Sequence, residues 1–233
     1  MSRGAIVIEE RVRVPADVFE LERFRDWAHS SSFPDRGRIS FIGGEIEVDM
    51  SPEEIETHNK VKTQLLADLV RFVQSHDLGE LLSDRAFLVN EAAELATEPD
   101  IMFSSWDGLR SGRVRYGERV RGSERYVEVN GSPDLIVEVV SQNSVRKDTV
   151  LLRERYFRAG VAEYWIVDAR GDGVELTLLA RPASGAADGT AGEYREVAPD
   201  ADDFRASPVL GRAFRIVRDV NPVGGAAYRL LDR

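Results

Sequence analysis

The chain has no cysteine among its 233 residues, which excludes disulfide bonds and thiolate metal sites. It also lacks any stretch that approaches the roughly 20 apolar residues needed to span a bilayer. The N-terminal segment MSRGAIVIEERVRVP contains no long apolar run and carries Glu9 and Glu10, so it does not resemble a signal peptide. From these absences we expect a cytoplasmic protein without membrane contact.

Positive charge is scarce as well, because 31 Lys and Arg face 41 Asp and Glu and leave a net charge of −10. This balance argues against a protein that coats nucleic acid through a broad basic surface. It does not exclude an enzyme that grips a phosphodiester locally, since a bound divalent metal supplies positive charge where it is needed. The 42% hydrophobic and 31% charged content is typical of a folded globular chain.

The spacing of the apolar residues predicts alternating helices and strands. We expect a helix over 17–29, a hairpin over 39–49, and then a long helix that begins with a capping box of Ser51 and Glu54. Further strands are expected at 80–91, 98–103 and 134–140, a helix at 145–159, and a hairpin over 163–180. This order predicts an α/β fold in which helices flank a mixed sheet.

The length favours one domain over residues 1–233. We expect its core at about 17–180, with β-rich extensions at 1–16 and 181–233. Both extensions could pair between subunits through exposed strand edges. We therefore expect a homodimer.

Two carboxylates, Asp134 and Glu138, lie in the stretch SPDLIVEVVS, which otherwise has the composition of a buried strand. A charge there is costly unless a metal ion, a basic side chain or water at an open strand end compensates it. Asp100 follows Pro99 at the start of another expected strand. If the two strands are neighbours, Asp100 and Glu138 can converge on one Mg²⁺ ion. Alternatively, an Asp after a Pro marks a turn, and a Glu in a strand simply faces water.

Four stretches between about residues 39 and 170 carry a family resemblance: GGEIEVDMSPEEIETHNKVKTQLLADL, EPDIMF, SPDLIVEVVSQNSVRKD and LRERYFRAGVAEYWIVDAR. They resemble the Uma2 family of "putative restriction endonucleases" (domain of unknown function 820), within the PD-(D/E)XK nuclease superfamily. The resemblance implies a restriction-endonuclease-like core whose strand-end acids bind a divalent metal, Mg²⁺ or Mn²⁺. It also implies metal-dependent hydrolysis of nucleic acid, with DNA as the expected substrate.

The resemblance implies roles for four residues. Asp100 would be the acid of the Pro-Asp motif and Glu138 the acid of the (D/E)XK motif, both of them metal ligands. Glu45 would match the family's Glu near the site and assist catalysis. His58 matches the family's His, although a His on a helix with an apolar face is often simply packed and hydrogen-bonded.

One departure from the superfamily pattern concerns its lysine, which should follow two residues after the acid. Val140 stands at that position, so the lysine is absent or has migrated. Lys147, at the start of the next expected helix, is the best substitute, and it could orient the attacking water or stabilise the phosphate. It could equally be a surface lysine beside Asp148. On this reasoning Glu138 pairs with a metal, or with Lys147 when no metal is bound.

Asp134 precedes Glu138 by four residues, so both side chains share a strand face at roughly 13 Å separation, too far to share one ion. We expect Asp134 to cap the strand entrance or hold the preceding loop, or to support the site indirectly. Ser141 and Gln142 could contact substrate or water. Arginines between residues 110 and 125 form either a solvated loop or a flap that contacts phosphate.

Two other functional classes remain open at this point. The fold could persist as a catalytically inactive module for binding or assembly, which Val140 and the net charge favour and which Asp100, Glu138 and Lys147 oppose. The chain could also act on a small phosphodiester, because a fold alone does not determine a function. Tyr156 is expected to be core packing.

Overall fold

The computed structural model describes residues 14–35, 37–117, 126–182 and 192–233. Most of the expected N-terminal extension lies outside these residues, as do Arg119, Arg121 and Arg125 of the arginine cluster. Within the described ranges, no helix is both long and apolar enough to cross a membrane.

The described strands form two mixed six-stranded sheets and one three-stranded antiparallel sheet. The first sheet has the order β2 (Glu45–Asp49), β1 (Arg38–Ile42), β5 (Leu95–Thr97), β4 (Phe87–Asn90), β8 (Glu128–Gly131), β7 (Val114–Tyr116). The second has the order β12 (Arg195–Glu196), β11 (Glu175–Ala180), β10 (Glu163–Asp168), β9 (Leu135–Val139), β6 (Ile101–Ser105), β3 (Gly79–Ser83). The third contains β13 (Arg205–Ser207), β14 (Arg212–Val220) and β15 (Ala226–Asp232).

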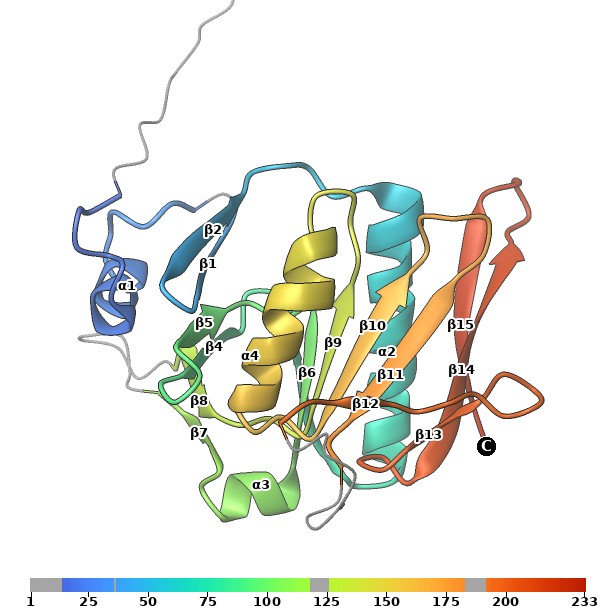
Figure 1. The fold of residues 1–233 in the computed structure, drawn as a ribbon. Coiled ribbons are helices and arrows are strands. Elements are labelled where there is room, and N and C mark those ends of the chain that lie inside the picture. The colour runs from blue at the N-terminus through green and yellow to red at the C-terminus, as the bar shows by residue number, and fades with distance from the viewer. Residues whose placement is uncertain (1–13, 36, 118–125, 183–191) are drawn as a thin grey trace, which may run out of the picture.

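The helices cover these sheets in layers (Figure 1). They are α1 (Leu21–Ala28), the π-helical turn η1 (Ile55–Asn59) with α2 (Lys60–Ser75), α3 (Trp106–Arg110), and the π-helical turn η2 (Lys147–Leu151) with α4 (Leu152–Arg158). One apolar cluster packs α2 between the second sheet and the C-terminal sheet. A second cluster joins α4 to both six-stranded sheets, and a third packs α1 on the first sheet. The structure therefore confirms the mixed α/β architecture.

Several of the expected elements are confirmed closely. The hairpin at 39–49 is β1 and β2, and the hairpin at 163–180 is β10 and β11. The central strand is β9, which runs parallel to β10 and antiparallel to β6. The expected C-terminal β structure is also present in β13, β14 and β15.

Two local expectations were wrong. The single strand expected at 80–91 is two strands in different sheets, β3 and β4, because the chain turns at Arg85, whose φ of 65° is left-handed. The capping box at Ser51 is absent, since η1 begins at Ile55 and the cap is Glu54, whose carboxylate accepts from the N–H groups of Glu56 and Thr57. Ser51 instead donates to Asp49 Oδ1.

A buried ion cluster ties α1 to β8 and makes this contact sensitive to acid. Glu128 is 3% exposed and accepts hydrogen bonds from Arg25 Nη2 at 2.7 Å and from His29 Nε2 at 2.8 Å. Burial alone would raise the pKa of Glu128, but the hydrogen bonds from His29 and Arg25 lower it from 4.5 to about 2. A depressed carboxyl pKa adds stability above the unfolded value, and this stability is lost as pH falls through the folded value.

We expect Glu128→Gln to lower the free energy of unfolding at neutral pH by about 2 kcal/mol, because it leaves partly buried Arg25 without its partner. The variant should also lose less stability than the wild type between pH 4.5 and 2. Urea unfolding at several pH values measures both effects. Glu91→Gln is the matched control, because Glu91 contacts the same arginine but is 81% exposed, and it should cost little. Equal acid sensitivity in Glu128→Gln and the wild type would contradict the assignment.

Candidate active site

Two buried carboxylates face each other where β6 and β9 meet. In this antiparallel pair Ile101 lies opposite Val137. One step further along both strands, Asp100 therefore lies opposite Glu138, at the Cβ separation of about 5 Å that cross-strand neighbours have. Both residues are only 2% exposed. The expectation that these strands are neighbours and bring the two acids together is confirmed.

Main-chain groups hold both carboxylates in place. The Val139 N–H donates to Asp100 Oδ2 at 2.9 Å, and the Asp100 N–H donates to Glu138 Oε2 at 3.3 Å. Tyr156 on α4 donates its hydroxyl hydrogen to Glu138 Oε1 at 2.6 Å. Glu138 and Lys147 form no direct ion pair within the described residues, so their expected pairing is present only as a charge interaction, in which Lys147 opposes the rise that burial causes in the pKa of Glu138. A buried tyrosine hydroxyl needs a partner, and Tyr156, expected to serve packing alone, finds it in this carboxylate.

Lys147 lies beside the acid pair without bonding to it. Its Nζ is 3.4 Å from Asp148 Oδ1, and its side chain is 19% exposed. Burial and the neighbouring Asp100 carboxylate raise the pKa of Glu138 to about 8, and the charge of Lys147 opposes that rise. Burial likewise raises the pKa of Asp148 to about 6. Lys147 thus contributes positive charge to a group of closely spaced acids.

A layer of three nitrogen donors covers Asp100. Arg38 Nη1 lies 3.2 Å and Lys62 Nζ 3.8 Å from Asp100 Oδ1, and His58 Nε2 lies 3.7 Å from Oδ2. Arg38 begins β1, whereas His58 and Lys62 lie one helical turn apart across the junction of η1 and α2. His58 is 3% exposed, and burial lowers its pKa. The structure brings His58 to the acid pair, as the family resemblance implied.

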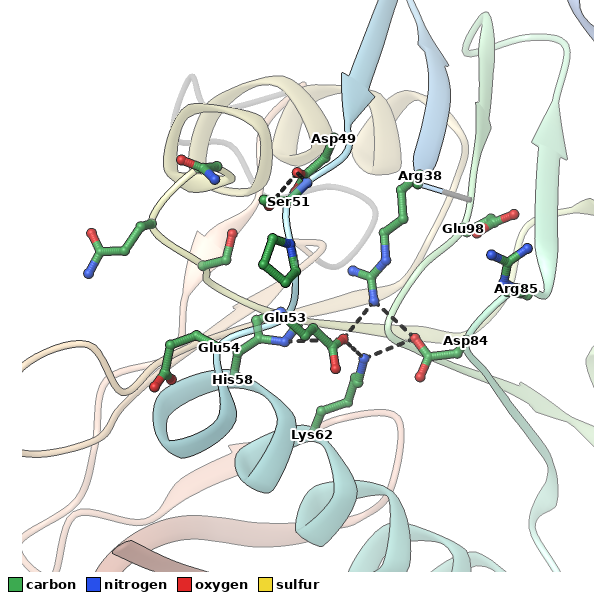
Figure 2. A pocket seen from close by; sticks show the side chains of 15 residues that line it. Arg38, Asp49, Ser51, Glu53, Glu54, His58, Lys62, Asp84, Arg85 and Glu98 are labelled. Carbon is green, nitrogen blue, oxygen red and sulfur yellow. Dashed lines mark hydrogen bonds and ion pairs between the residues drawn. The ribbon is translucent and has the colours of Figure 1, made fainter. Parts of the chain in front are cut away.

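Two further carboxylates, those of Glu53 and Asp84, contact Arg38 and Lys62 (Figure 2). Glu53 accepts from Arg38 Nη2 at 2.9 Å and also from Lys62 Nζ. Asp84 lies 3.2 Å from Arg38 Nη2 and 3.1 Å from Lys62 Nζ. Arg38 and Lys62 are therefore shared among three carboxylates, those of Asp100, Glu53 and Asp84.

Two open cavities adjoin the network. A cavity of about 580 Å³ is lined by Arg38, His58 and Lys62 together with the expected contact residues Ser141 and Gln142. A second cavity, of about 300 Å³, is lined by Arg38 and Lys147 among others. Arg38, Asp49, Ser51 and Asn143 line both cavities. Neither Asp100 nor Glu138 lines either of these two cavities. The acid pair is separated from the larger one by Arg38, His58 and Lys62, which contact Asp100 and line that cavity.

One candidate residue, Glu45, lies away from these cavities. Glu45 is exposed at the tip of the β1–β2 hairpin, and it lines neither cavity. Asp49, at the opposite end of β2, lines both cavities instead. The strand carries Glu45 roughly 13 Å from Asp49, and the family-implied role of Glu45 stays a prediction.

Asp134 lies at the opposite end of β9 from Glu138. It accepts from the Ser105 N–H at 2.8 Å and from Arg113 Nη2 at 2.6 Å. The expectation that it holds the preceding loop is confirmed. Arg113, in the described part of the arginine cluster, is thus engaged in structure at that end of the strand.

The acid pair has the ligand chemistry that Mg²⁺ uses. Mg²⁺ is commonly bound by one or two carboxylates and keeps several waters, and Asp100 with Glu138 supply two carboxylates with free lone pairs. Their direct opposition in a buried setting also creates repulsion that a cation relieves. In the part of the chain that the structure describes, no group of three or more His, Cys, Asp or Glu is arranged to hold a metal. The residues fit a site in which water completes the coordination.

Comparisons with known proteins point to one family. The family model "Uma2: Putative restriction endonuclease" matches residues 21–210. Among solved structures, a putative nuclease belonging to DUF820 from Anabaena variabilis ATCC 29413 is similar, with a TM-score of 0.57 and 16% identity. The match covers 82% of this chain and 90% of that chain, and at this identity it shows a shared fold. No curated protein matches the chain.

Proposed function

The chain belongs to the Uma2 family of "putative restriction endonucleases", and from this premise we propose that it is a metal-dependent endonuclease acting on DNA. The observation that carries the proposal is the pair of buried carboxylates, Asp100 directly before β6 and Glu138 on β9, which lie opposite each other beside cations that line an open cavity. Opposed acids at strand ends are a feature of nucleases of this superfamily.

In the proposed reaction Asp100 and Glu138 hold Mg²⁺ or Mn²⁺. Such an ion, when bound, lowers the pKa of a coordinated water and offsets charge on the phosphate. The chain's own residues fix the geometry, because the Val139 N–H orients Asp100 and the Tyr156 hydroxyl orients Glu138. Both contacts hold the carboxylates in single positions before substrate arrives.

Lys147 takes the role of the motif lysine that Val140 replaces. Burial opposes its charge, but Asp148, Glu138 and Asp100 together raise the pKa of Lys147, so it stays protonated at neutral pH. It lines the smaller cavity, where an ammonium group can bind a phosphate oxygen or hold the attacking water. A homodimer remains part of the proposal, because cleavage of both strands of a duplex needs two such sites.

Cleavage assays with supercoiled plasmid, single-stranded RNA and bis(p-nitrophenyl) phosphate, each with Mg²⁺, Mn²⁺ or EDTA, test the function. We expect nicking or linearisation of the plasmid with either metal and none with EDTA. Asp100→Asn should abolish this activity. Glu45→Gln should retain it, since Glu45 is exposed at the hairpin tip.

Other results of these assays would support a different function or a different role for Glu45. Hydrolysis of the small diester alone would make it a small-molecule phosphodiesterase. Absence of cleavage from all three substrates, with DNA still bound, would favour the catalytically inactive module. Loss of activity in Glu45→Gln would show that the family-implied role of this residue holds despite its distance from the acids.

A further inference from the structure

The carboxylate of Glu53 lies against the same three side chains, Arg38, Lys62 and His58, that lie against Asp100. Its Oε1 accepts from Arg38 Nη2 at 2.9 Å and from Lys62 Nζ, and it lies 3.4 Å from His58 Nδ1. The same three side chains also lie 3.2 to 3.8 Å from the carboxylate oxygens of Asp100. Arg38, Lys62 and His58 thus lie close both to Glu53 Oε1 and to Asp100, a candidate metal ligand.

Two of the three donors are buried more deeply than the Glu53 carboxylate, whereas Arg38, at 30%, is as exposed as Glu53. The side chains of Lys62 and His58 are 6% and 3% exposed, whereas that of Glu53 is 31% exposed. Asp84 also contacts both Arg38 and Lys62, so these cations keep a partner if Glu53 leaves. Arg38, Lys62 and His58 can therefore keep their arrangement when the Glu53 carboxylate is absent.

Glu53 leaves one of the three surrounding side chains, His58, without a hydrogen bond at its Nδ1 atom. His58 Nδ1 is buried and has no hydrogen-bond partner, although it faces the Glu53 carboxylate at 3.4 Å. A buried polar atom without a partner is rare and costly. A phosphate group carries more acceptor oxygens, pointing in more directions, than the planar carboxylate, so it offers an acceptor for each of the three side chains.

The backbone allows Glu53 to move. It belongs to residues 51–54, which form neither helix nor strand between β2 and η1. Its carboxylate also accepts from Asn59 Nδ2 at 2.6 Å. Glu53 already lines the larger cavity, and the loss of these side-chain contacts would break no helix or strand hydrogen bond.

The negative charge of the larger cavity disfavours the binding of a phosphate while the Glu53 carboxylate is in place. Its lining has five carboxylates against three permanently charged cations. A phosphate added beside Glu53 would meet strong repulsion at this short range. An anionic ligand can therefore occupy the donor layer only if the Glu53 carboxylate leaves.

We propose that Arg38, Lys62 and His58 form a subsite for a phosphate group of the nucleic acid, and that Glu53 occupies this subsite in the ligand-free protein. The assignment of the ligand to nucleic acid rests on the proposed function, whereas the anion site rests on the contacts above. Substrate binding then displaces Glu53 and places the phosphate next to Asp100. Glu53 acts as an internal competitor for this position.

Equilibrium binding in EDTA tests the proposal without any cleavage step. Inorganic phosphate and a short single-stranded oligonucleotide are titrated into wild type and Glu53→Gln by calorimetry. We expect Glu53→Gln to bind both ligands about tenfold more tightly, because the competing charge is gone. Adding Lys62→Gln should remove this gain. Asp107→Asn, which removes one charge from a side chain that is 96% exposed on α3, should match the wild type.

Unchanged or weaker binding by Glu53→Gln would overturn the proposal and make Glu53 a structural partner of the cations. A gain for inorganic phosphate but not for the oligonucleotide would overturn the assignment to nucleic acid. If Glu53→Gln does not fold, the Lys62 Nζ resonance of the wild type is followed during a phosphate titration, and the absence of any shift would also overturn it. A wild type that cleaves no substrate would count against the proposed function and leave these binding results unaffected.

Discussion

Glu138→Gln is expected to lower DNA cleavage by about 10³–10⁴-fold, the scale of losing one essential catalytic group. The substitution keeps the side-chain volume but removes one of the two carboxylates proposed to hold the metal. Calorimetry with Mn²⁺ should show a saturable site in the wild type and none in the variant. Thermal stability without metal should not fall, because the substitution also removes the repulsion between Glu138 and Asp100.

Glu163→Gln is a stringent control for this experiment. Glu163 is another buried glutamate of the same sheet, on the neighbouring strand β10, but its carboxylate accepts from Trp165 and Ser207, away from the acid pair. Its replacement should leave the activity per folded molecule near that of the wild type. If Glu138→Gln cleaves DNA at a rate comparable to Glu163→Gln, the acid pair is not the catalytic centre.

Lys147→Met should lower cleavage by about 10²–10³-fold, the effect of removing one preorganised charged donor from a reacting phosphate. The metal affinity should stay the same or increase, because the variant loses positive charge beside Asp100 and Glu138. Single-turnover cleavage rates and Mn²⁺ calorimetry on the same preparations separate the two effects. Arg146→Met removes a neighbouring positive charge that is 69% exposed and should have little effect.

The double variant Lys147→Met with Asp148→Asn distinguishes two causes of this loss. Asp148 is buried, and Lys147 is 3.4 Å from its Oδ1, so Lys147→Met alone leaves an uncompensated acid. If that acid were the cause, Asp148→Asn would restore cleavage. We expect the double variant to cleave as slowly as Lys147→Met, because the ammonium group itself is missing. Recovery of activity would remove Lys147 from the proposed mechanism.

The sequence predicted the acid pair because both acids leave a local signal. Glu138 interrupts an apolar strand, and Asp100 follows a proline at a strand start. Each signal can be found within a few residues, and the strand pairing then brings the two together. The same reasoning predicted the hairpins at 39–49 and 163–180, where turn and strands are contiguous in the chain.

The donor layer could not be predicted in the same way, because its members come from separate elements. Arg38 begins β1, Glu53 lies in an irregular connection, and Asp84 lies between β3 and β4. No spacing in the sequence relates them, and only the assembled sheets place them together. Lys62 offered one usable signal, since it follows His58 by four residues and therefore shares a helical face with it.

Tyr156 and Glu45 show two other limits of local patterns. A tyrosine within an apolar helix face reads as packing, and its hydroxyl partner on β9 becomes visible only in three dimensions. Glu45 matches a family motif, yet the direction of β2 takes it away from the cavity and brings Asp49 to it. The family motif predicts an acid on β2, but the direction of the strand decides that Asp49, and not Glu45, lines the cavities.

The hydrogen bonds between the acids and the main chain have a consequence for how the site can be observed. The pairing of β6 and β9 ends at Ile101 and Val137. Beyond that point the amide hydrogens of Asp100 and Val139 are bound by carboxylates, not by carbonyl groups. Their exchange with solvent deuterium therefore reports the position of the two carboxylates directly. Two backbone amides of the protein thus serve as probes of the candidate site, and they require no substrate.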